Sequence, residues 1–317
     1  MKLILAPLAD YTDAPFRRLC RECGADFAYT EMVSAAALAY GHNPTRHLLE
    51  RMDGEGPVGC QVFGASEGDL AVAARVVTGR GFAELNLNAG CPMPNVTRCG
   101  AGAKLVGDPA KIGRLIKVLK ENTDLPVTLK TRLGPRPGTD TIFEIVDAAV
   151  GAGAAGIAVH ARYTSQMHGG PVHLDTLAEV VRRSPVPVVG NGGVRTKADL
   201  AAMSETGVAG VMVGRGALGN PCIFNDLKGV YDGVGAPERP AGPALCNRHL
   251  EYMLEFREQL VRKFPEDHVP SVDGYASVKM HTHLFRYFSG RPGAAALRAR
   301  LNAVRTLAEI REIIKTI

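Results

Sequence analysis

The sequence contains no apolar run approaching the ~18 to 20 residues that a membrane-spanning helix needs. Its first apolar stretch, residues 1–7, is too short for a signal peptide and is soon followed by Asp10. The seven cysteines are odd in number and lack the spacing of a disulfide framework, which favours a reducing compartment. We therefore expect a soluble, cytoplasmic protein that does not associate with membranes.

The sequence also lacks the spacing of a zinc or redox motif. Cys20 and Cys23 form a C-x-x-C pair, but they fall within a helical pattern, and no second pair or H-x-x-x-H follows at zinc spacing. The formal net charge of +5 is mild, so it permits an anionic partner without requiring one. We therefore predict no metal site, and nothing in the sequence requires a protein partner.

What the sequence does contain is a repeated alternation of short apolar runs and helical stretches. The apolar runs, read as strands, are residues 3–6, 27–30, 57–62, 83–88, 126–131, 156–160, 186–190 and 210–213. A first helix, capped by Thr12 or Asp13 and closed by Gly24, follows the first run. Further helical stretches are residues 69–78, 110–121, 142–151, 174–183 and 197–206.

This alternation predicts the fold class. Strands that are apolar on both faces and alternate with helices are typical of a parallel sheet covered on both sides. Eight such units in about 220 residues fit an α/β fold of the (β/α)8 TIM-barrel type. A doubly wound open sheet is the alternative.

The last quarter of the chain has a different pattern. A Gly- and Pro-rich stretch, residues 231–243, breaks the alternation and is read as a linker. Apolar residues then recur at helical spacing in 250–260 and again in 297–314, which predicts a small all-α helical bundle with one long final helix. We therefore divide the chain into a barrel domain, residues 1–232, and a helical domain, residues 244–317. The latter carries twelve Lys and Arg against eight Asp and Glu.

The stretch from Glu84 to Pro92 is the strongest candidate for chemistry. Alternating apolar residues lead to Leu87, and the Gly-Cys-Pro that follows must end the strand, so Cys91 is predicted at a strand tip. Gly100 and Gly102 give the next segment the backbone freedom of a mobile loop. A buried structural cysteine is the alternative.

In a barrel, the carboxyl ends of the strands form the active site. The predicted ends carry polar or charged residues at seven of the eight strands, and the last two carry Asn-Gly-Gly at 191–193 and Gly-Arg-Gly at 214–216. Glycine backbone and an arginine at these two loops favour a bound phosphate. Lys130, at the fifth end, fits either a fixed positive charge beside a flavin ring or a Schiff base.

Taken together, these motifs resemble the flavin-dependent tRNA-dihydrouridine synthases of the bacterial type. The resemblance rests on LAPLADYTDAPFR, TEMVSA, QVFGA, LNLNAGCPMPNVTRCGAGAKL, LKTRLG, VHARYTSQMHGG, VVGNGGV and VGRGALGNPCIF, which cover the whole barrel in order. It implies a barrel that binds FMN, a helical domain that binds tRNA, and NADPH or NADH as reductant. Asn86 and His168 stand where the family usually has Asp and Tyr.

The resemblance also implies roles for individual residues. Cys91 would be the proton donor. The residues that would line FMN are Pro7, Leu8, Ala9, Gln61, Lys130, His160, Asn191, Gly192, Gly193, Gly214 and Arg215. The target uridine would meet Glu31, Asn88 and Arg132, to which we add Arg162 at the sixth strand end.

The reaction implied is reduction of the C5–C6 double bond of a uridine in tRNA. NADPH would load a hydride onto the flavin, N5 would deliver it to C6, and Cys91, kept as a protonated thiol, would give a proton to C5. The uridine would have to be flipped out of the folded RNA. Two alternatives remain: a flavoenzyme that acts on a free pyrimidine, and an RNA-binding protein that keeps the barrel only as a scaffold.

The helical domain offers a candidate RNA contact between Tyr275 and Phe288. Tyr275, Val278, Phe285 and Phe288 recur at helical spacing as an apolar stripe, whereas Lys279, His283 and Arg286 share another stripe. We predict that Lys279 and Arg286 bind tRNA phosphates; a merely solvated helix face is the alternative.

Overall fold

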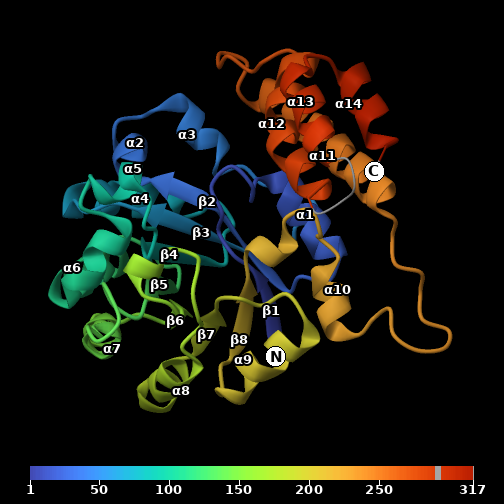
Figure 1. Ribbon diagram of the computed structural model, residues 1–317. Coiled ribbons are helices and arrows are strands. Elements are labelled where there is room, and N and C mark those ends of the chain that lie inside the picture. Colours follow the sequence, from blue (N-terminus) through green and yellow to red (C-terminus); the bar gives the residue numbers. More distant parts are fainter. Residues whose placement is uncertain (290–293, 317) are drawn as a thin grey trace.

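The computed structural model describes residues 1–289 and 294–316, and its centre is a closed barrel of parallel strands (Figure 1). Neighbouring strands pair in chain order, and β1 closes the barrel against β8. The predicted TIM barrel is therefore confirmed. The strands are β1 (Lys2–Leu5), β2 (Phe27–Ser34), β3 (Val58–Phe63), β4 (Glu84–Ala89), β5 (Val127–Arg132), β6 (Gly156–His160), β7 (Val188–Asn191) and β8 (Gly210–Val213).

Helices surround the barrel, and local capping explains where several of them begin. Asp13 caps the first helix by accepting a hydrogen bond from the Phe16 amide, and Ser66, Asp108 and Thr196 act similarly at later helices. The helices are α1 (Ala14–Glu22), α2 (Ala35–Ala39), α3 (Asn43–His47), α4 (Glu67–Val77), α5 (Pro94–Thr97), α6 (Pro109–Glu121), α7 (Ile142–Gly151), α8 (Leu174–Arg183), α9 (Lys197–Glu205) and α10 (Ile223–Lys228). Short 3-10 turns, η1 (Gly102–Gly107), η2 (Thr164–Gln166) and η3 (Arg215–Ala217), lie in the loops after β4, β6 and β8.

Most predicted strand boundaries agree with the structure within two residues, but β2 is longer than predicted. It runs to Ser34, and its pairing with β3 shifts register between Tyr29 and Met32. Glu31 lies inside this irregularity rather than at a strand end.

The C-terminal part of the chain is helical, as predicted, with two differences in the helix boundaries. Its helices are α11 (Gly242–Lys263), α12 (Val272–Tyr287), α13 (Ala294–Ala303) and α14 (Leu307–Ile314). The predicted single final helix is wrong, because Thr306 and Glu309 form a capping box that starts α14 separately. The irregular segment before α11 also ends earlier than predicted, since Gly242 and Pro243 already belong to the first turn of α11.

The helical part packs beside α1, on the right of the barrel in Figure 1. Leu19 of α1 and Cys23, which follows α1, share one apolar cluster with Leu250 and Met253 of α11 and Met280 of α12. Ion pairs between Arg18 and Glu255 and between Lys263 and Glu50 flank this cluster. Among the described helices, none is both long and apolar enough to cross a membrane.

Candidate active site

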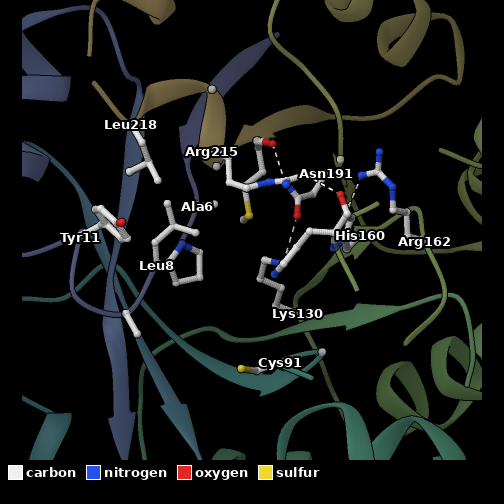
Figure 2. A pocket seen from close by; sticks show the side chains of 18 of the residues that line it. Ala6, Leu8, Tyr11, Cys91, Lys130, His160, Arg162, Asn191, Arg215 and Leu218 are labelled. Carbon is white, nitrogen blue, oxygen red and sulfur yellow. Dashed lines mark hydrogen bonds between the residues drawn. The ribbon is translucent and has the colours of Figure 1, made fainter. Parts of the chain in front are cut away.

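A cavity of about 500 Å³ opens at the carboxyl ends of the strands (Figure 2). Its wall combines loops from distant parts of the sequence, because parallel strands bring all their carboxyl ends to one rim. The predicted site residues that line it are Pro7, Leu8, Ala9, Asn88, Cys91, Lys130, Arg132, His160, Arg162, Asn191, Gly192, Gly193, Gly214, Arg215 and Arg286. Most of the predicted site residues therefore line a single cavity.

Cys91 is held at the cavity wall by its neighbours in the loop after β4. The Asn88 side-chain oxygen accepts hydrogen bonds from the backbone amides of Gly90 (3.1 Å) and Cys91 (3.0 Å). The Cys91 carbonyl accepts a third from the Ala103 amide (2.8 Å). Figure 2 shows the thiol across the cavity from Arg215. The loop therefore fixes the backbone of Cys91 and leaves its partly exposed thiol facing the cavity.

A buried chain of amides supports Asn88 from below. Gln61 is fully buried, donates to Asn86 (2.7 Å) and accepts from Asn88 (2.8 Å). The structure does not bring Gln61 to the cavity wall, so its predicted contact with the cofactor is not observed there. Asn86 points inward like Asn88, as strand alternation predicts, and donates to Thr128 (2.8 Å). These side chains position the Cys91 loop from inside the barrel.

Lys130 belongs to β5, which neighbours the strand that leads to Cys91, and its side chain contacts the end of β7. Its Nζ donates to Asn191 Oδ1 (3.2 Å), and Asn191 Nδ2 donates to the Met212 carbonyl (2.7 Å) (Figure 2). Burial, and secondly the nearby Arg132, lower the pKa of Lys130 to about 7. An anionic group placed beside this amine would therefore favour its charged form.

The backbone after β7 leaves room for a ligand to approach. Gly192 and Gly193 adopt φ of 129° and 79°, a region in which side chains are strained. A Cβ on Gly192 would also lie 3.0 Å from His160 Cδ2. Together with Gly214 and Arg215 after β8, they form the open backbone predicted for phosphate binding.

The charge of the cavity is strongly positive. Six cationic side chains and one carboxylate, Asp10, line it; the cations are Lys130, Arg132, Arg162, Arg195, Arg215 and Arg286. Burial, with help from these cations, lowers the pKa of His160 well below its usual range and that of His168 to about 4. Both imidazoles are thus neutral, and the cavity suits a polyanionic ligand.

Several of these arginines have structural hydrogen bonds as well, and Arg215 donates to the His168 carbonyl (2.7 Å). Arg132 is almost fully buried and donates to the carbonyls of Gly90 (2.7 Å), Tyr163 (3.2 Å) and Met167 (2.7 Å), which tie the loops after β4 and β6 together. Arg162 donates to the Gly170 carbonyl (3.1 Å). The Arg132 Nη2 has no such bond among the described residues, so this end of the guanidinium is available to a ligand.

Glu31 and Lys279 are not in this cavity. Both line a second cavity of about 230 Å³ between the barrel and α12, together with Asp13. Burial raises the pKa of Glu31, which accepts a hydrogen bond from the Asp10 amide (2.6 Å). The structure therefore separates Glu31, predicted to meet the uridine, from Cys91.

The predicted stripes of α12 need correction. His283, assigned to the polar stripe, is 1% exposed, whereas Val278, assigned to the apolar stripe, is 68% exposed. The helix is covered on more than one side, by α1 and by the other C-terminal helices, so helical spacing alone does not identify its solvent face. Of the three stripe residues only Arg286 reaches the active-site cavity.

Tyr11 and Arg195 are among the cavity residues that were not predicted. The Tyr11 hydroxyl accepts a hydrogen bond from Arg286 Nε (3.0 Å), and the guanidinium lies 5.4 Å from the centre of the tyrosine ring. Arg195 lies two residues after the Asn-Gly-Gly of the seventh strand end. This proximity is the sequence signal that could have identified it. Tyr11 links the barrel rim to α12. No pattern in the sequence indicates that these two segments lie side by side.

Comparisons with known proteins agree with this geometry. The dihydrouridine synthase (Dus) family profile matches residues 4–316. A probable tRNA-dihydrouridine synthase of Mycobacterium tuberculosis is 32% identical over 97% of this chain and 80% of its own length. The tRNA-dihydrouridine synthase B of Xanthomonas campestris is 34% identical over 87% of each chain.

A solved structure shares the barrel. Morphinone reductase, solved in complex with tetrahydroNAD, superposes with a TM-score of 0.53 at 10% identity, covering 77% of this chain and 89% of its own. At this identity the similarity concerns the fold alone. The family match over nearly the whole chain and the identity to curated relatives establish that the chain belongs to the dihydrouridine synthase family.

Proposed function

We propose that the protein reduces the C5–C6 double bond of a uridine in tRNA, with FMN as cofactor and NADPH as reductant. Family membership supports the reaction. The observation that carries the proposal is that Cys91, Lys130 and the glycines after β7 and β8 line one basic cavity. NADPH and a proton would be consumed for each uridine reduced.

The cavity fits FMN in size and in donor chemistry. Its volume of about 500 Å³ lies within the usual range of small-molecule sites. Lys130 and Asn191 would hold the ring edge, and Gly192, Gly193 and Arg215 would hold the phosphate. A reduced flavin bound there supplies a hydride to a carbon of the substrate.

In this proposal the residues of the chain have three tasks. The Cys91 thiol holds the proton that the neighbouring carbon of the uracil receives, because it is the acidic group that the loop after β4 fixes toward the cavity. Asn88 positions that loop. Arg132 contributes its free Nη2 edge to the substrate, and the cationic wall stabilises the negative charge that develops on the uracil oxygen.

We also propose the division of labour along the chain. The barrel, residues 1–232, would bind the flavin, and the helical part, residues 244–317, would bind tRNA. Arg286 supports this arrangement because it belongs to α12 and yet lines the cavity rim. An RNA seated on the helical part would then lie beside the cavity into which its flipped uridine must enter.

The test is a reaction with the purified full-length protein, NADPH and tRNA that lacks dihydrouridine. Mass spectrometry of the nucleosides should show dihydrouridine, and the protein should be yellow. A colourless protein would contradict the flavin. Reduction of free uridine or uracil as efficiently as of tRNA would favour the free-pyrimidine enzyme instead.

A further inference from the structure

Asp13, His249 and His283 meet behind the wall of the active-site cavity, although they are far apart in the sequence. Their ligand atoms, one carboxylate oxygen and one ring nitrogen from each histidine, all lie within 4.8 Å of one another. Asp13 caps α1 of the barrel, whereas His249 belongs to α11 and His283 to α12. The group thus joins the three helices that form the junction in Figure 1.

Three of the four histidine ring nitrogens in this group are buried without a hydrogen-bond partner within the described residues. Within residues 1–289 and 294–316, His249 Nε2 and both ring nitrogens of His283 are buried without a hydrogen bond. His249 is 0% and His283 1% exposed. A buried polar atom without a partner costs about 1 to 3 kcal/mol, so the unpaired nitrogens on both rings indicate that a ligand lies between the histidines, and one ion would take one nitrogen from each ring.

The chemistry of the group suits a metal ion. His249 Nε2 is buried without a hydrogen-bond partner in the described part of the chain, so it can offer its lone pair to an ion. His249 Nδ1 lies 3.3 Å from the Tyr287 hydroxyl, an outer contact that orients the ring and leaves Nε2 for a ligand. One Asp13 oxygen accepts from the Phe16 amide, and the other makes no hydrogen bond within the described residues.

The charged groups around Asp13 are also compatible with a divalent cation. Asp13 and Glu31 both face the second cavity, and the cations near them are Lys279 and Arg17. Arg17 is already paired with Glu55 (2.7 Å). The remaining cation near these two carboxyl groups is Lys279. The cavity, which touches Asp13, offers space for a water on the fourth position of a tetrahedral ion.

We propose that Asp13, His249 and His283 bind a divalent transition-metal ion, with Zn²⁺ as the fitting member of the class, and that this ion fastens the helical part to the barrel. Two imidazoles and one carboxylate form a ligand set that such ions accept. With bonds of about 2.0 to 2.2 Å, the group closes on an ion after a shift of about 1 Å. The sequence predicted no metal site because these residues have no motif spacing: 236 positions separate Asp13 from His249.

The first measurement is metal binding by the full-length protein after removal of metals with a chelator. Titration with Co²⁺ should give one ion per chain, with visible bands of nitrogen and oxygen coordination and without the charge-transfer bands of thiolate ligands. Titration with Zn²⁺ should raise the thermal midpoint, because an ion that binds only the folded state stabilises it. A chain that stays metal-free, or that binds only through thiolates, would overturn the proposal.

Matched variants then locate the ion. Asp13→Asn retains the helix cap but is a poorer ligand, and we expect it to weaken Co²⁺ binding by about 100-fold or more, at least as much as loss of an outer-shell partner. His283→Gln should act likewise. His281→Gln, on the same helix and outside the group, should bind like the wild type.

The variants also separate a bound ion from a buried water. Wild-type affinity in Asp13→Asn would refute the assignment, whether or not His283→Gln folds. An unchanged thermal midpoint of the wild type in the presence of Zn²⁺ would mean that water, and not an ion, satisfies the two histidines. None of these measurements depends on the proposed reaction.

Discussion

At the residue scale, the backbone of Cys91 is fixed more firmly than its thiol. Asn88 and Ala103 together supply three hydrogen bonds to residues 90 and 91, but the thiol itself faces the cavity. Such an arrangement orients a side chain without consuming its proton. The thiol is therefore available for transfer to a substrate carbon.

We predict that Cys91→Ala suppresses dihydrouridine formation by about 100-fold or more, the usual contribution of a general acid. Flavin content and NADPH oxidation should remain, because neither requires this proton. Product is measured by mass spectrometry and NADPH oxidation by absorbance. Cys99→Ala, in the same loop but exposed, is the matched control and should behave like the wild type. Wild-type product formation by Cys91→Ala would exclude this residue as the acid.

The lowered pKa of Lys130 leads to a prediction about protons. With a pKa of about 7, its amine is mostly neutral at pH 8, and the anionic ring edge of a reduced flavin favours the charged form. Binding of reduced FMN at pH 8 should therefore take up a proton, whereas at pH 6 the amine is already charged and little uptake is expected. Calorimetry in buffers of different ionisation enthalpy measures this difference.

Lys130→Met should abolish the uptake at pH 8 and weaken flavin retention. Lys104→Met, at an exposed position, serves as the control. Equal uptake in Lys130→Met and wild type would show that another group carries the proton, and full flavin retention would remove Lys130 from the site.

At the element scale, the loop after β4 is shaped by Gly102 rather than opened by it. Gly102 has φ of 58°, and a Cβ there would lie 2.5 Å from the Cys91 carbonyl oxygen. Gly107, in the same 3-10 turn, has no atom within 4 Å of such a Cβ. From the sequence, Gly102 was interpreted as a source of loop mobility. In the structure it allows the backbone to pass close to the Cys91 carbonyl.

Gly102→Ala should therefore destabilise the protein by about 1 to 3 kcal/mol and lower dihydrouridine formation, since the Cys91 carbonyl must move. Gly107→Ala should be close to neutral in both. Thermal unfolding and product formation at a temperature where both variants are folded test the pair. If the two variants have the same stability and the same product formation, the close approach at Gly102 does not contribute to either.

The strands and the barrel could be predicted from the sequence because strands buried on both faces are continuous apolar runs with polar residues at their ends. Where prediction failed, the deciding contact was tertiary. Glu31 lines the cavity beside α12 and not the one that contains Cys91, and His283 of α12 is buried against Phe16 of α1. The break before α14, by contrast, could have been predicted from the sequence, because Thr306 and Glu309 fit a capping box. The regular apolar spacing on both sides of them favoured a continuous helix instead.

At the scale of the whole molecule, the cationic cavity and the helical part meet at Arg286. Arg286 is exposed, belongs to α12 and contacts Tyr11 of the barrel rim. Lys279 belongs to the same helix but lines the second cavity, together with the carboxyl groups of Glu31 and Asp13. Two residues that the sequence placed on one RNA-binding stripe thus have different surroundings.

These surroundings predict different consequences for RNA binding. Arg286→Ala should weaken tRNA binding and reduce the slope of log affinity against log salt by about 0.7 to 0.9, the value for one phosphate contact. Lys279→Met should leave that slope unchanged and lower thermal stability, because it removes the cation beside two buried carboxylates. The measurement is tRNA affinity at several salt concentrations for wild type and both variants. A wild-type slope in Arg286→Ala would mean that this arginine serves only to hold Tyr11, whereas a reduced slope in Lys279→Met would restore the predicted stripe as an RNA contact.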